Sequence, residues 1–245
     1  MNIIEEKVVK LINENSLSKK IKILELTPGE GNLSRKLYSD GFTNLETLDI
    51  NPENFQIKEI KCHKGNLNDP LPFEDETYDL VISIEGIEHL EKQYQFAEEL
   101  NRVLKKNGHL ILSTPNIINF ASRLRFLLTG FYSLASRPSS EFEKNWVIEH
   151  IYPLTFWQLR HILHTNGLFI KKIDADRYRR SSRFWKFMAP LTRFITRKTL
   201  LKETDERQKK VNMEITDQMY QNELFSGRTQ IVYARKEESD YIKQI

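Results

Sequence analysis

The chain has 245 residues, of which 39% are hydrophobic and 29% are charged, and its net charge is +3. This is an ordinary soluble composition with enough apolar residues for a core, and the small net charge does not by itself indicate a polyanionic partner. The single cysteine, Cys62, excludes an intrachain disulfide and a cysteine-based zinc site, and it fits a reducing compartment.

The beginning of the chain does not resemble a targeting segment. The sequence MNIIEEKVVK has acids where a signal peptide carries bases, and no long apolar stretch follows. Nowhere does an apolar run approach the roughly 18 residues of a membrane span. These features predict a cytoplasmic protein.

The first half of the chain alternates helical and strand patterns. Helical spacing of apolar residues predicts helices over Ile3–Asn15, from Gly29 to Ser39, and over Glu91–Leu104, where the lysines and Gly108 of KKNG indicate a C-terminus. Apolar runs predict five strands, at Ile21–Leu26, at NLETLDI ending near Asp49, at Ile57–Gly65, at Tyr78–Ile84 and at His109–Pro115. The alternation predicts βαβ units and a parallel sheet with right-handed crossovers.

After Pro115 the pattern is less regular. A helical stretch begins near Asn119, and Pro153–Asp174 predicts a helix, a glycine stop and a sixth strand. Arg177–Asn222 is expected to be mainly helical, and Arg228–Lys236 is expected to form the last strand. One domain over residues 1–245, with helical cover segments at about 116–152 and 176–225, is the simplest interpretation.

The turn after the first strand, in ILELTPGEGNLSRKL, indicates a ligand site, because ligands of open parallel sheets bind at the carboxyl ends of strands. It lacks the Gly-Lys-Ser/Thr ending of a phosphate-binding P-loop, and Ser34 stands where a dinucleotide fingerprint has its third glycine. Glu30 lies at the helix entrance, where a pyrophosphate would bind, and its charge disfavours a phosphate.

S-adenosylmethionine has no phosphate and carries a sulfonium cation, an amino-acid end, a ribose and an adenine. Glu25 ends the first strand, Gly29 and Gly31 permit close approach of a ligand to the backbone, and Asp49 ends the second strand at the ribose position. The alternative for Asp49 is a turn acid that precedes Asn51.

Five segments, in this order, resemble successive motifs of the class I S-adenosylmethionine-dependent methyltransferases of the type 11 and type 23 domains. They are LELTPGEGN, LDINPE, GNLNDPLPFEDETYDLVISIEGIEHL, LNRVLKKNGHLILSTPN and EHIYPLTFWQLRHILHTNGLFI. The resemblance implies a Rossmann-like, seven-stranded α/β sheet, mostly parallel, with helices on both faces and an antiparallel last strand. It also implies the following cofactor-binding residues: Glu25, Thr27, Gly29 and Gly31 at the methionine end, Asp49 and Ile50 at the ribose, Asn66 and Leu67 at the adenine, and Ile84 and Glu85 beside the methyl group.

The chain departs from the family pattern at three places. Thr27 replaces the first loop glycine and is expected to restrict the loop, since a Cβ narrows the allowed φ and ψ. Asn66 replaces an acid but can still accept a hydrogen bond from an adenine amino group. Lys106, Asn107 and Gly108 replace Pro-Gly-Gly before the fifth strand.

The segment EGIEHL supplies the candidate catalytic residues Glu85, Glu88 and His89 just after the fourth strand. If Glu85 begins a helical turn, all three lie on one face. The spacing resembles the ubiquinone-pathway O-methyltransferases and the small-RNA terminal 2′-O-methyltransferases. In the latter a further histidine completes a divalent metal site, which here would be made by Glu85, Glu88, His89 and His150. We expect a metal-free site, in which His89 is a base or orients the acceptor and His150 is structural, and the metal site is the alternative.

The basic stretch after Asp176 has three interpretations. Its apolar residues can pack on the sheet with solvated bases outside; it can contact a membrane surface; or it can bind RNA, which the low net charge disfavours. The bases are Arg177, Arg179, Arg180, Arg183, Lys186, Arg193, Arg197, Lys198 and Lys202, and the apolar residues at helical spacing are Phe184, Phe187, Met188, Leu191 and Ile195.

The sequence thus predicts a methyltransferase that moves a methyl group from S-adenosylmethionine to an oxygen of a small-molecule, glycan or lipid-linked acceptor, with possible contact to a membrane surface. Proposed acceptor contacts are Tyr132, Arg137, Trp146 and Tyr152. The alternatives are a terminal 2′-O-methyltransferase of RNA and a scaffold protein that keeps the fold without methylation.

Overall fold

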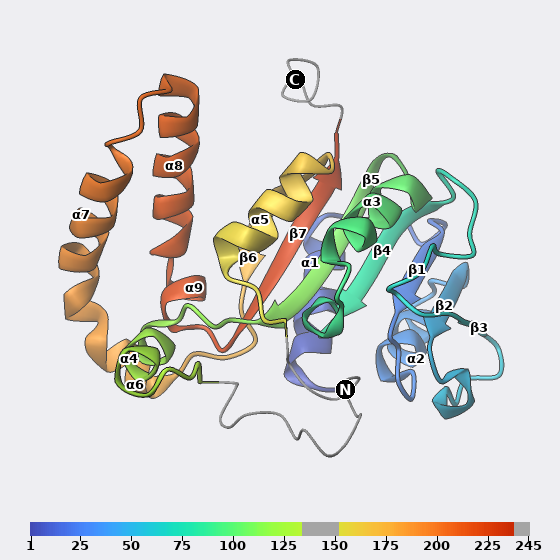
Figure 1. The fold of residues 1–245 in the computed structure, drawn as a ribbon. Helices are drawn as coiled ribbons and strands as arrows, with labels where there is room; N and C mark the ends of the chain where they lie inside the picture. The colour runs from blue at the N-terminus through green and yellow to red at the C-terminus, as the bar shows by residue number, and fades with distance from the viewer. Residues whose placement is uncertain (134–151, 238–245) are drawn as a thin grey trace.

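A computed structural model describes residues 1–133 and 152–237 (Figure 1). Within these residues, seven strands form one sheet in the order β3-β2-β1-β4-β5-β7-β6. The strands are β1 (Ile23–Leu26), β2 (Leu45–Asp49), β3 (Lys61–Lys64), β4 (Tyr78–Ile84), β5 (Leu104–Pro115), β6 (Leu168–Asp174) and β7 (Thr229–Lys236). Strands β1 to β5 pair in parallel, whereas β7 runs antiparallel to both β5 and β6. The predicted fold class, including the antiparallel last strand, is confirmed.

Helices cover both faces of the sheet (Figure 1). The described helices are α1 (Ile3–Glu14), α2 (Asn32–Ser39), η1 (Pro52–Asn54), η2 (Ile87–His89), α3 (Gln93–Val103), α4 (Phe120–Thr129), α5 (Phe156–Thr165), α6 (Arg180–Phe184), η3 (Trp185–Met188), α7 (Ala189–Leu200), α8 (Glu206–Met219) and α9 (Asn222–Ser226). Capping boxes begin α1, at Asn2 and Glu5, and α5, at Thr155 and Gln158. Each box satisfies two backbone N–H groups that a helix start leaves without partners.

The core has two parts, one on each face of the sheet. Alternate residues of a strand point to opposite faces. Leu80 and Ile82 of β4 therefore pack in a cluster with residues of α1 and α2, whereas Val81 packs in a cluster with residues of α3 and α5. Because both faces are covered, the central strands β1 and β4 are mainly apolar, which is why they could be predicted from short hydrophobic runs.

The predicted end of α3 at Leu104 agrees with the structure to within one residue, but the KKNG that follows is not a helix cap. Helix α3 ends at Val103, and β5 begins at once with Leu104, which is fully buried opposite Tyr78 of β4. The register then shifts, so that the next pair is Leu80 with His109. The residues between, including Asn107 with a φ of 60°, form an irregularity inside the strand instead of a helix cap.

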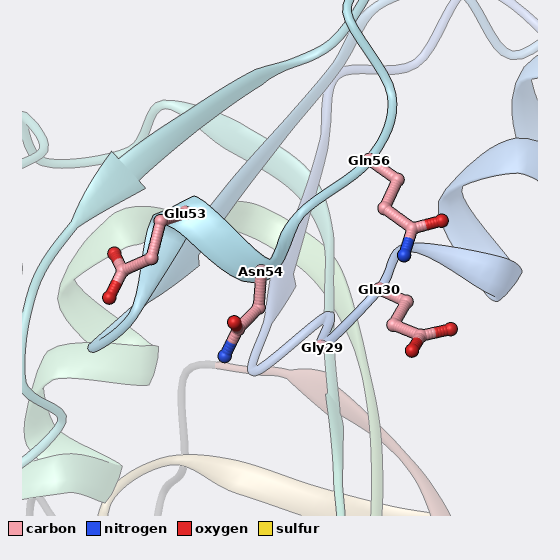
Figure 2. Close-up of a pocket in the computed structure, with 5 residues that line it drawn as sticks. All are labelled: Gly29, Glu30, Glu53, Asn54 and Gln56. Atoms are coloured by element: carbon pink, nitrogen blue, oxygen red, sulfur yellow. The ribbon is translucent and has the colours of Figure 1, made fainter.

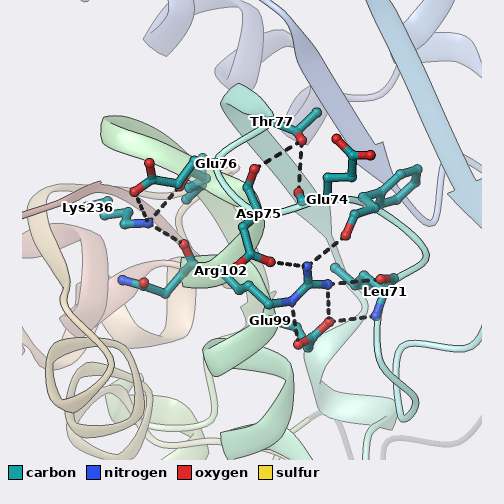
Figure 3. A network of polar contacts seen from close by, with 11 residues as sticks. Leu71, Glu74, Asp75, Glu76, Thr77, Glu99, Arg102 and Lys236 are labelled. Carbon is teal, nitrogen blue, oxygen red and sulfur yellow. Dashed lines mark hydrogen bonds and ion pairs between the residues drawn. The ribbon is translucent and has the colours of Figure 1, made fainter.

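At the end of the sheet away from the carboxyl ends of the parallel strands, Arg102 of α3 holds the loop that leads into β4 (Figure 3). Its guanidinium donates to the backbone oxygens of Phe73 at 2.7 Å and Leu71 at 2.9 Å, and to the carboxylates of Asp75 at 2.8 Å and Glu99 at 2.7 Å. A planar guanidinium with five donors suits such a junction. The loop is thereby fixed to α3.

The chain between β6 and β7 forms α6 to α9, as the predicted helical character of Arg177–Asn222 requires. Helices α7 and α8 stand side by side, away from the sheet (Figure 1). Pro190 lies in the first turn of α7, where its missing N–H costs nothing. The interpretation of the chain as a single domain with cover segments at 116–152 and 176–225 stays a prediction.

Candidate active site

The predicted cofactor residues gather at the carboxyl ends of β1, β2 and β4. Strand β1 lies between β2 and β4, so the crossovers leave it in opposite directions, and this is the switch point where open α/β sheets bind ligands. Glu25 lies near the end of β1, Asp49 ends β2, and Ile84 ends β4. The topology therefore brings these three positions to one edge.

The loop after β1 is built on left-handed backbone conformations. The φ angle is 55° at Thr27, 55° at Gly29 and 87° at Gly31. The hydroxyl of Thr27 donates to the backbone oxygens of Leu26, at 2.7 Å, and Ile84, at 3.3 Å. Thr27 takes the left-handed conformation of the glycine it replaces, and its hydroxyl ties β1 to β4. The expectation that its Cβ restricts the loop stays a prediction.

The two loop glycines differ in their surroundings. No atom of the described residues lies within 4 Å of a Cβ built on Gly29, so the space before its backbone is open. A Cβ on Gly31 would lie 2.6 Å from the ring of Phe55 and 2.9 Å from Ile57. Gly29 thus permits a ligand to approach the backbone, whereas Gly31 permits close packing at the start of α2.

Asp49 lies beside a hollow of about 490 Å³ lined by Gly29, Glu30, Glu53, Asn54 and Gln56. Figure 2 shows these five residues on the loop after β1 and on the segment after β2. The Asp49 carboxylate accepts from the Asn51 N–H at 2.9 Å and from the Gly29 N–H at 3.4 Å. Asp49 is thus a turn acid, as the alternative had it, and it also joins the two segments that border the hollow.

Glu25 is 3% exposed and accepts a hydrogen bond from the Ser34 hydroxyl of α2. Burial raises the pKa of its carboxyl from 4.5 to about 7, with Ser34 opposing the shift. Glu25 therefore fixes the start of α2 from within the core and has little surface to offer a ligand.

The predicted adenine-side residues lie in the loop after β3. The Asn66 side-chain oxygen accepts from the Asn68 N–H at 3.0 Å, and Leu67 is buried. Ile50 follows Asp49 and is half-buried. The Asn66 oxygen has a second lone pair that a ligand amino group could use.

Glu85 does not begin a helical turn, so the predicted single helical face is wrong. Its φ is 49°, and only Ile87–His89 are helical, as the 3-10 turn η2. The Glu85 N–H donates to the Ser113 hydroxyl at 3.2 Å, and this hydroxyl lies 3.5 Å from the Glu85 carboxylate. Burial raises the pKa of the Glu85 carboxyl, whereas the positive charge of Arg228 lowers it.

Glu88 has no exposed surface and accepts a hydrogen bond from the Thr114 hydroxyl at 2.9 Å. Burial, followed by the negative charge of Glu85, raises the pKa of its carboxyl. His89, the next residue, is half-buried, and its N–H donates to the Gly86 oxygen at 3.1 Å. The end of β4 thus carries two carboxyl groups whose pKa values are shifted toward neutrality.

Among residues 1–133 and 152–237, no group of three or more His, Cys, Asp or Glu side chains could hold a metal ion. His150, the fourth predicted ligand, lies outside these residues, as do Arg137 and Trp146. Of the other proposed acceptor contacts, Tyr132 stacks on Phe126 with 4.5 Å between the ring centroids. Tyr152 is exposed, and its backbone N–H donates to the backbone oxygen of Glu88 at 3.2 Å.

Several polar groups near Glu85 and Glu88 come from the next strands and were not predicted from the sequence. Ser113 and Thr114 come from the end of β5. Asp176 follows β6 and is almost fully buried, and its carboxylate lies 3.7 Å from the guanidinium of Arg228, which directly precedes β7. The signal was present, because each of these residues lies at or next to a strand end on this edge of the sheet.

The site fits S-adenosylmethionine. The open space before Gly29 leaves room for a ligand against the loop backbone, and the Asp49 carboxylate lies beside the hollow. Glu85, which is partly exposed, offers a carboxyl group near the end of β4, which suits a sulfonium cation. Among the described residues that line the hollow, none is basic, so the hollow itself does not favour a phosphate.

The sheet order defines the class of protein, a Rossmann-like α/β domain with its candidate site at the switch point. The sequence of residues 24–112 matches a family model described as a methyltransferase domain. Residues 24–112 thus carry a methyltransferase domain, which confirms the resemblance to the class I S-adenosylmethionine-dependent methyltransferases found in the sequence.

One relative, a ubiquinone biosynthesis O-methyltransferase from Rickettsia typhi, is 34% identical over 113 residues. The match covers 43% of this chain and 45% of the relative, so the chain is matched to less than half of that protein. A putative sarcosine dimethylglycine methyltransferase from Galdieria sulphuraria has a similar structure, with a TM-score of 0.55, 16% identity, and coverage of 96% of this chain and 85% of the other.

A second similar structure carries a different name. It is the [4+2]-cyclase SpnF, with a TM-score of 0.54, 13% identity, and coverage of 95% of this chain and 81% of the other. Similarity at this level of identity shows the fold alone. The reaction and the acceptor therefore have to be argued from the residues at the site.

Proposed function

We propose that the protein methylates an oxygen atom, with S-adenosylmethionine as the methyl donor. One observation carries the proposal: Glu85 and Glu88, at the end of β4 beside the glycine loop, have carboxyl groups whose pKa values burial raises. A hydroxyl acceptor must lose its proton as the methyl group arrives, and a base is most effective when its pKa lies near the working pH.

The residues divide the work by their exposure. S-adenosylmethionine supplies an electrophilic methyl group on its sulfonium. The backbone at Gly29 contacts the methionine end of the cofactor, and the Asp49 carboxylate binds its ribose. Glu85 and His89, both partly exposed, take the acceptor's proton or orient its hydroxyl, while the fully buried Glu88 positions them through the short η2 turn. The acceptor is a small molecule, a glycan or a lipid-linked compound, and the name of the Rickettsia relative supports an O-linked product.

Binding of S-adenosylhomocysteine tests the cofactor assignment. In calorimetry, Asp49→Ala should weaken binding by roughly 10- to 100-fold, because hydrogen bonds to a charged group contribute about 1.5–3 kcal/mol. Glu59→Gln, an exposed carboxylate between β2 and β3, is the matched control and should bind as the wild type does. Equal affinity of Asp49→Ala and wild type would contradict the role of Asp49.

The linkage of the transferred methyl group tests the reaction. The protein, S-adenosylmethionine with a tritiated methyl group, and total lipid and aqueous extracts of the source cells are incubated together. A product that is stable to mild base, releases its label as methyl iodide on treatment with hydriodic acid, and is reduced in Glu85→Gln or His89→Gln supports an ether oxygen as acceptor. Tritium released as methanol by mild base would indicate a carboxyl ester, and label in ribonuclease-sensitive material would favour the RNA 2′-O-methyltransferase. The absence of any labelled product, with S-adenosylhomocysteine bound, would support the scaffold alternative.

A further inference from the structure

Exposed apolar side chains concentrate in one part of the molecule. Of the seventeen large hydrophobic residues that are exposed among the described residues, ten lie in 126–131 and 184–201. We call these ten the exposed apolar surface: Phe126, Leu127, Leu128, Phe131, Phe184, Phe187, Leu191, Phe194, Ile195 and Leu201. Leu127 is 77% exposed and Phe184 is 73% exposed. So many exposed apolar side chains in two short segments indicate an interaction site.

Helix α4 packs against the α6–η3 segment, so the exposed apolar residues of these two segments lie in the same region of the molecule. The rings of Phe120 and Trp185 stack with 5.9 Å between their centroids, and the Ala121 N–H donates to the Ser182 hydroxyl at 3.1 Å. Figure 1 places α4 and α6 together at the base of α7. Since α4 follows β5 and α6 follows β6, the surface begins at the edge of the sheet that carries Glu85.

Helix α7 turns its apolar side away from α8. Residues Phe187, Leu191, Phe194 and Ile195 are three or four positions apart and share one face. The other side of α7 contacts α8, where Thr196 and Tyr220 form a hydrogen bond of 3.0 Å between their hydroxyls. The exposed face therefore has no partner among the described residues.

The charge around this surface is of one sign. Residues 177–202 contain nine lysines and arginines and no acid, and 116–133 contains Arg123 and Arg125 and no acid. Lys198 and Lys202 lie on the apolar side of α7 and its extension, four residues apart. Acids resume at Glu203 and along α8, where Asp217 pairs with Arg193 at 2.7 Å.

We infer that α4, α6, η3 and α7 dock on an anionic lipid bilayer. Exposed phenylalanines and leucines on one face, with lysines and arginines beside them, are typical of a helix that lies in the interface between lipid head groups and acyl chains. Long lysine side chains reach the head groups while their stems lie along the apolar surface. No helix in the described part of the chain is long and apolar enough to cross a membrane, so the contact is with the surface. If a second copy of this chain packed symmetrically on the same face, the lysines and arginines of the two copies would repel each other, so we favour the bilayer over a dimer.

Co-sedimentation with vesicles tests the inference without depending on methyl transfer. Full-length protein should bind phosphatidylcholine vesicles that contain phosphatidylglycerol at low and at physiological salt. The double variant Leu191→Glu/Phe194→Glu should bind at least roughly tenfold more weakly, because it places two carboxylates in the apolar contact. Lys198→Gln/Lys202→Gln should lose roughly fivefold per lysine on anionic vesicles only. Trp157→Glu, a half-exposed tryptophan of α5 outside the surface, is the matched control and should bind as wild type does.

Three outcomes would overturn the inference. The first is no binding to anionic vesicles at low salt. The second is vesicle binding that Leu191→Glu/Phe194→Glu leaves unchanged while its thermal unfolding matches wild type. The third is a dimer in sedimentation velocity that this double variant dissociates, without vesicle binding by wild type, which would make the surface an interface between copies. Binding to single-stranded RNA in place of vesicles would likewise overturn it.

Discussion

Two regions of this molecule differ in whether their apolar residues are buried or exposed. Around β1 to β4, buried side chains fill both faces of the sheet, and the loops at its carboxyl edge carry the candidate site. In α4, α6, η3 and α7, phenylalanines and leucines are largely exposed beside an excess of bases. The first region buries its apolar residues around the candidate site, whereas the second leaves its apolar residues exposed to solvent.

This difference predicts where substitutions will be felt. In the β1–β4 region, small changes should alter both stability and cofactor binding, because the loops are packed against the core. In the exposed helices, changes should leave the fold intact and alter only what the surface contacts. The predictions below test that division, from the largest expected effect to the smallest.

Gly31→Val should be the most damaging single change. A Cβ there meets the rings and methyls of Phe55 and Ile57 at a φ of 87°. A left-handed conformation costs a residue with a Cβ about 1–2 kcal/mol, and overpacking costs about 1–3 kcal/mol more. Urea unfolding should therefore show a loss of roughly 2–5 kcal/mol, and binding of S-adenosylhomocysteine should be lost.

Gly41→Val is the matched control for Gly31→Val. Its φ is 95°, but no atom of the described residues lies within 4 Å of an added Cβ. Its free energy of unfolding should fall only by the cost of the left-handed backbone, about 1–2 kcal/mol, and it should still bind the cofactor. Equal losses for both variants would contradict the view that the loop is packed against the segment after β2.

Glu25→Gln should flatten the dependence of stability on pH. Because the folded pKa of this carboxyl, about 7, lies above its unfolded value, the folded state binds more protons between pH 4.5 and 7. Stability is thus fully present below the unfolded pKa and falls as pH rises through the folded one. Removing the charge should recover up to roughly 3 kcal/mol at pH 8 relative to pH 4.5, at about 1.4 kcal/mol per unit.

Urea unfolding of Glu25→Gln and wild type across this pH range measures the effect as a difference between two slopes. The comparison is needed because Glu85 and Glu88, with raised pKa values, act in the same direction. Glu53→Gln, on the exposed η1, should keep the wild-type slope. If Glu25→Gln has that slope too, Glu25 is ionised in the folded state.

Arg160→Leu should loosen α8 without affecting the sheet. The buried guanidinium of Arg160 on α5 donates to Gln218 and Glu214 of α8, each at 2.6 Å. Because Glu214 is mostly exposed and can return to water, we expect a loss of about 1–2 kcal/mol. Amide hydrogen exchange in α8 should be roughly 5- to 30-fold faster, and exchange in β4 should not change.

Arg193→Gln, which breaks the exposed ion pair with Asp217 between α7 and α8, is the contrast and should cost about 0–1 kcal/mol. Faster exchange in β4 after Arg160→Leu would show that α8 and the sheet unfold together, and the proposed independence of the two regions would be wrong.

Most of the fold could be predicted from the sequence because the first half follows simple rules. The strands carry apolar runs, the helices carry apolar residues at helical spacing, and Gly29, Gly31 and Asp49 lie where the family motif has its cofactor residues. The failures were local. At KKNG, lysines and a glycine resemble a helix end, but burial of Leu104 against β4 outweighs that signal and begins the strand earlier.

The site was predicted less well wherever it depends on tertiary contacts. Thr27 takes a glycine conformation because its hydroxyl finds two backbone acceptors, a compensation that no pattern reveals. Glu85 leaves the helical region since its backbone N–H bonds to Ser113 on the neighbouring strand. Arg228 and Asp176 belong to elements far apart in the sequence, so only the sheet order brings them beside Glu85.

Arg228→Gln should have the smallest effect, a shift of the pH profile of methyl transfer by a fraction of a unit. The charge of Arg228 lowers the pKa of the Glu85 carboxyl, so its removal raises that pKa. A base works in its deprotonated form, and the rising limb of activity should therefore move to higher pH. The variant Arg35→Gln, on the exposed side of α2, should leave the profile in place. A profile that stays in place in Arg228→Gln but moves in His89→Gln would assign the base to His89, and Glu85 would then serve to orient the acceptor.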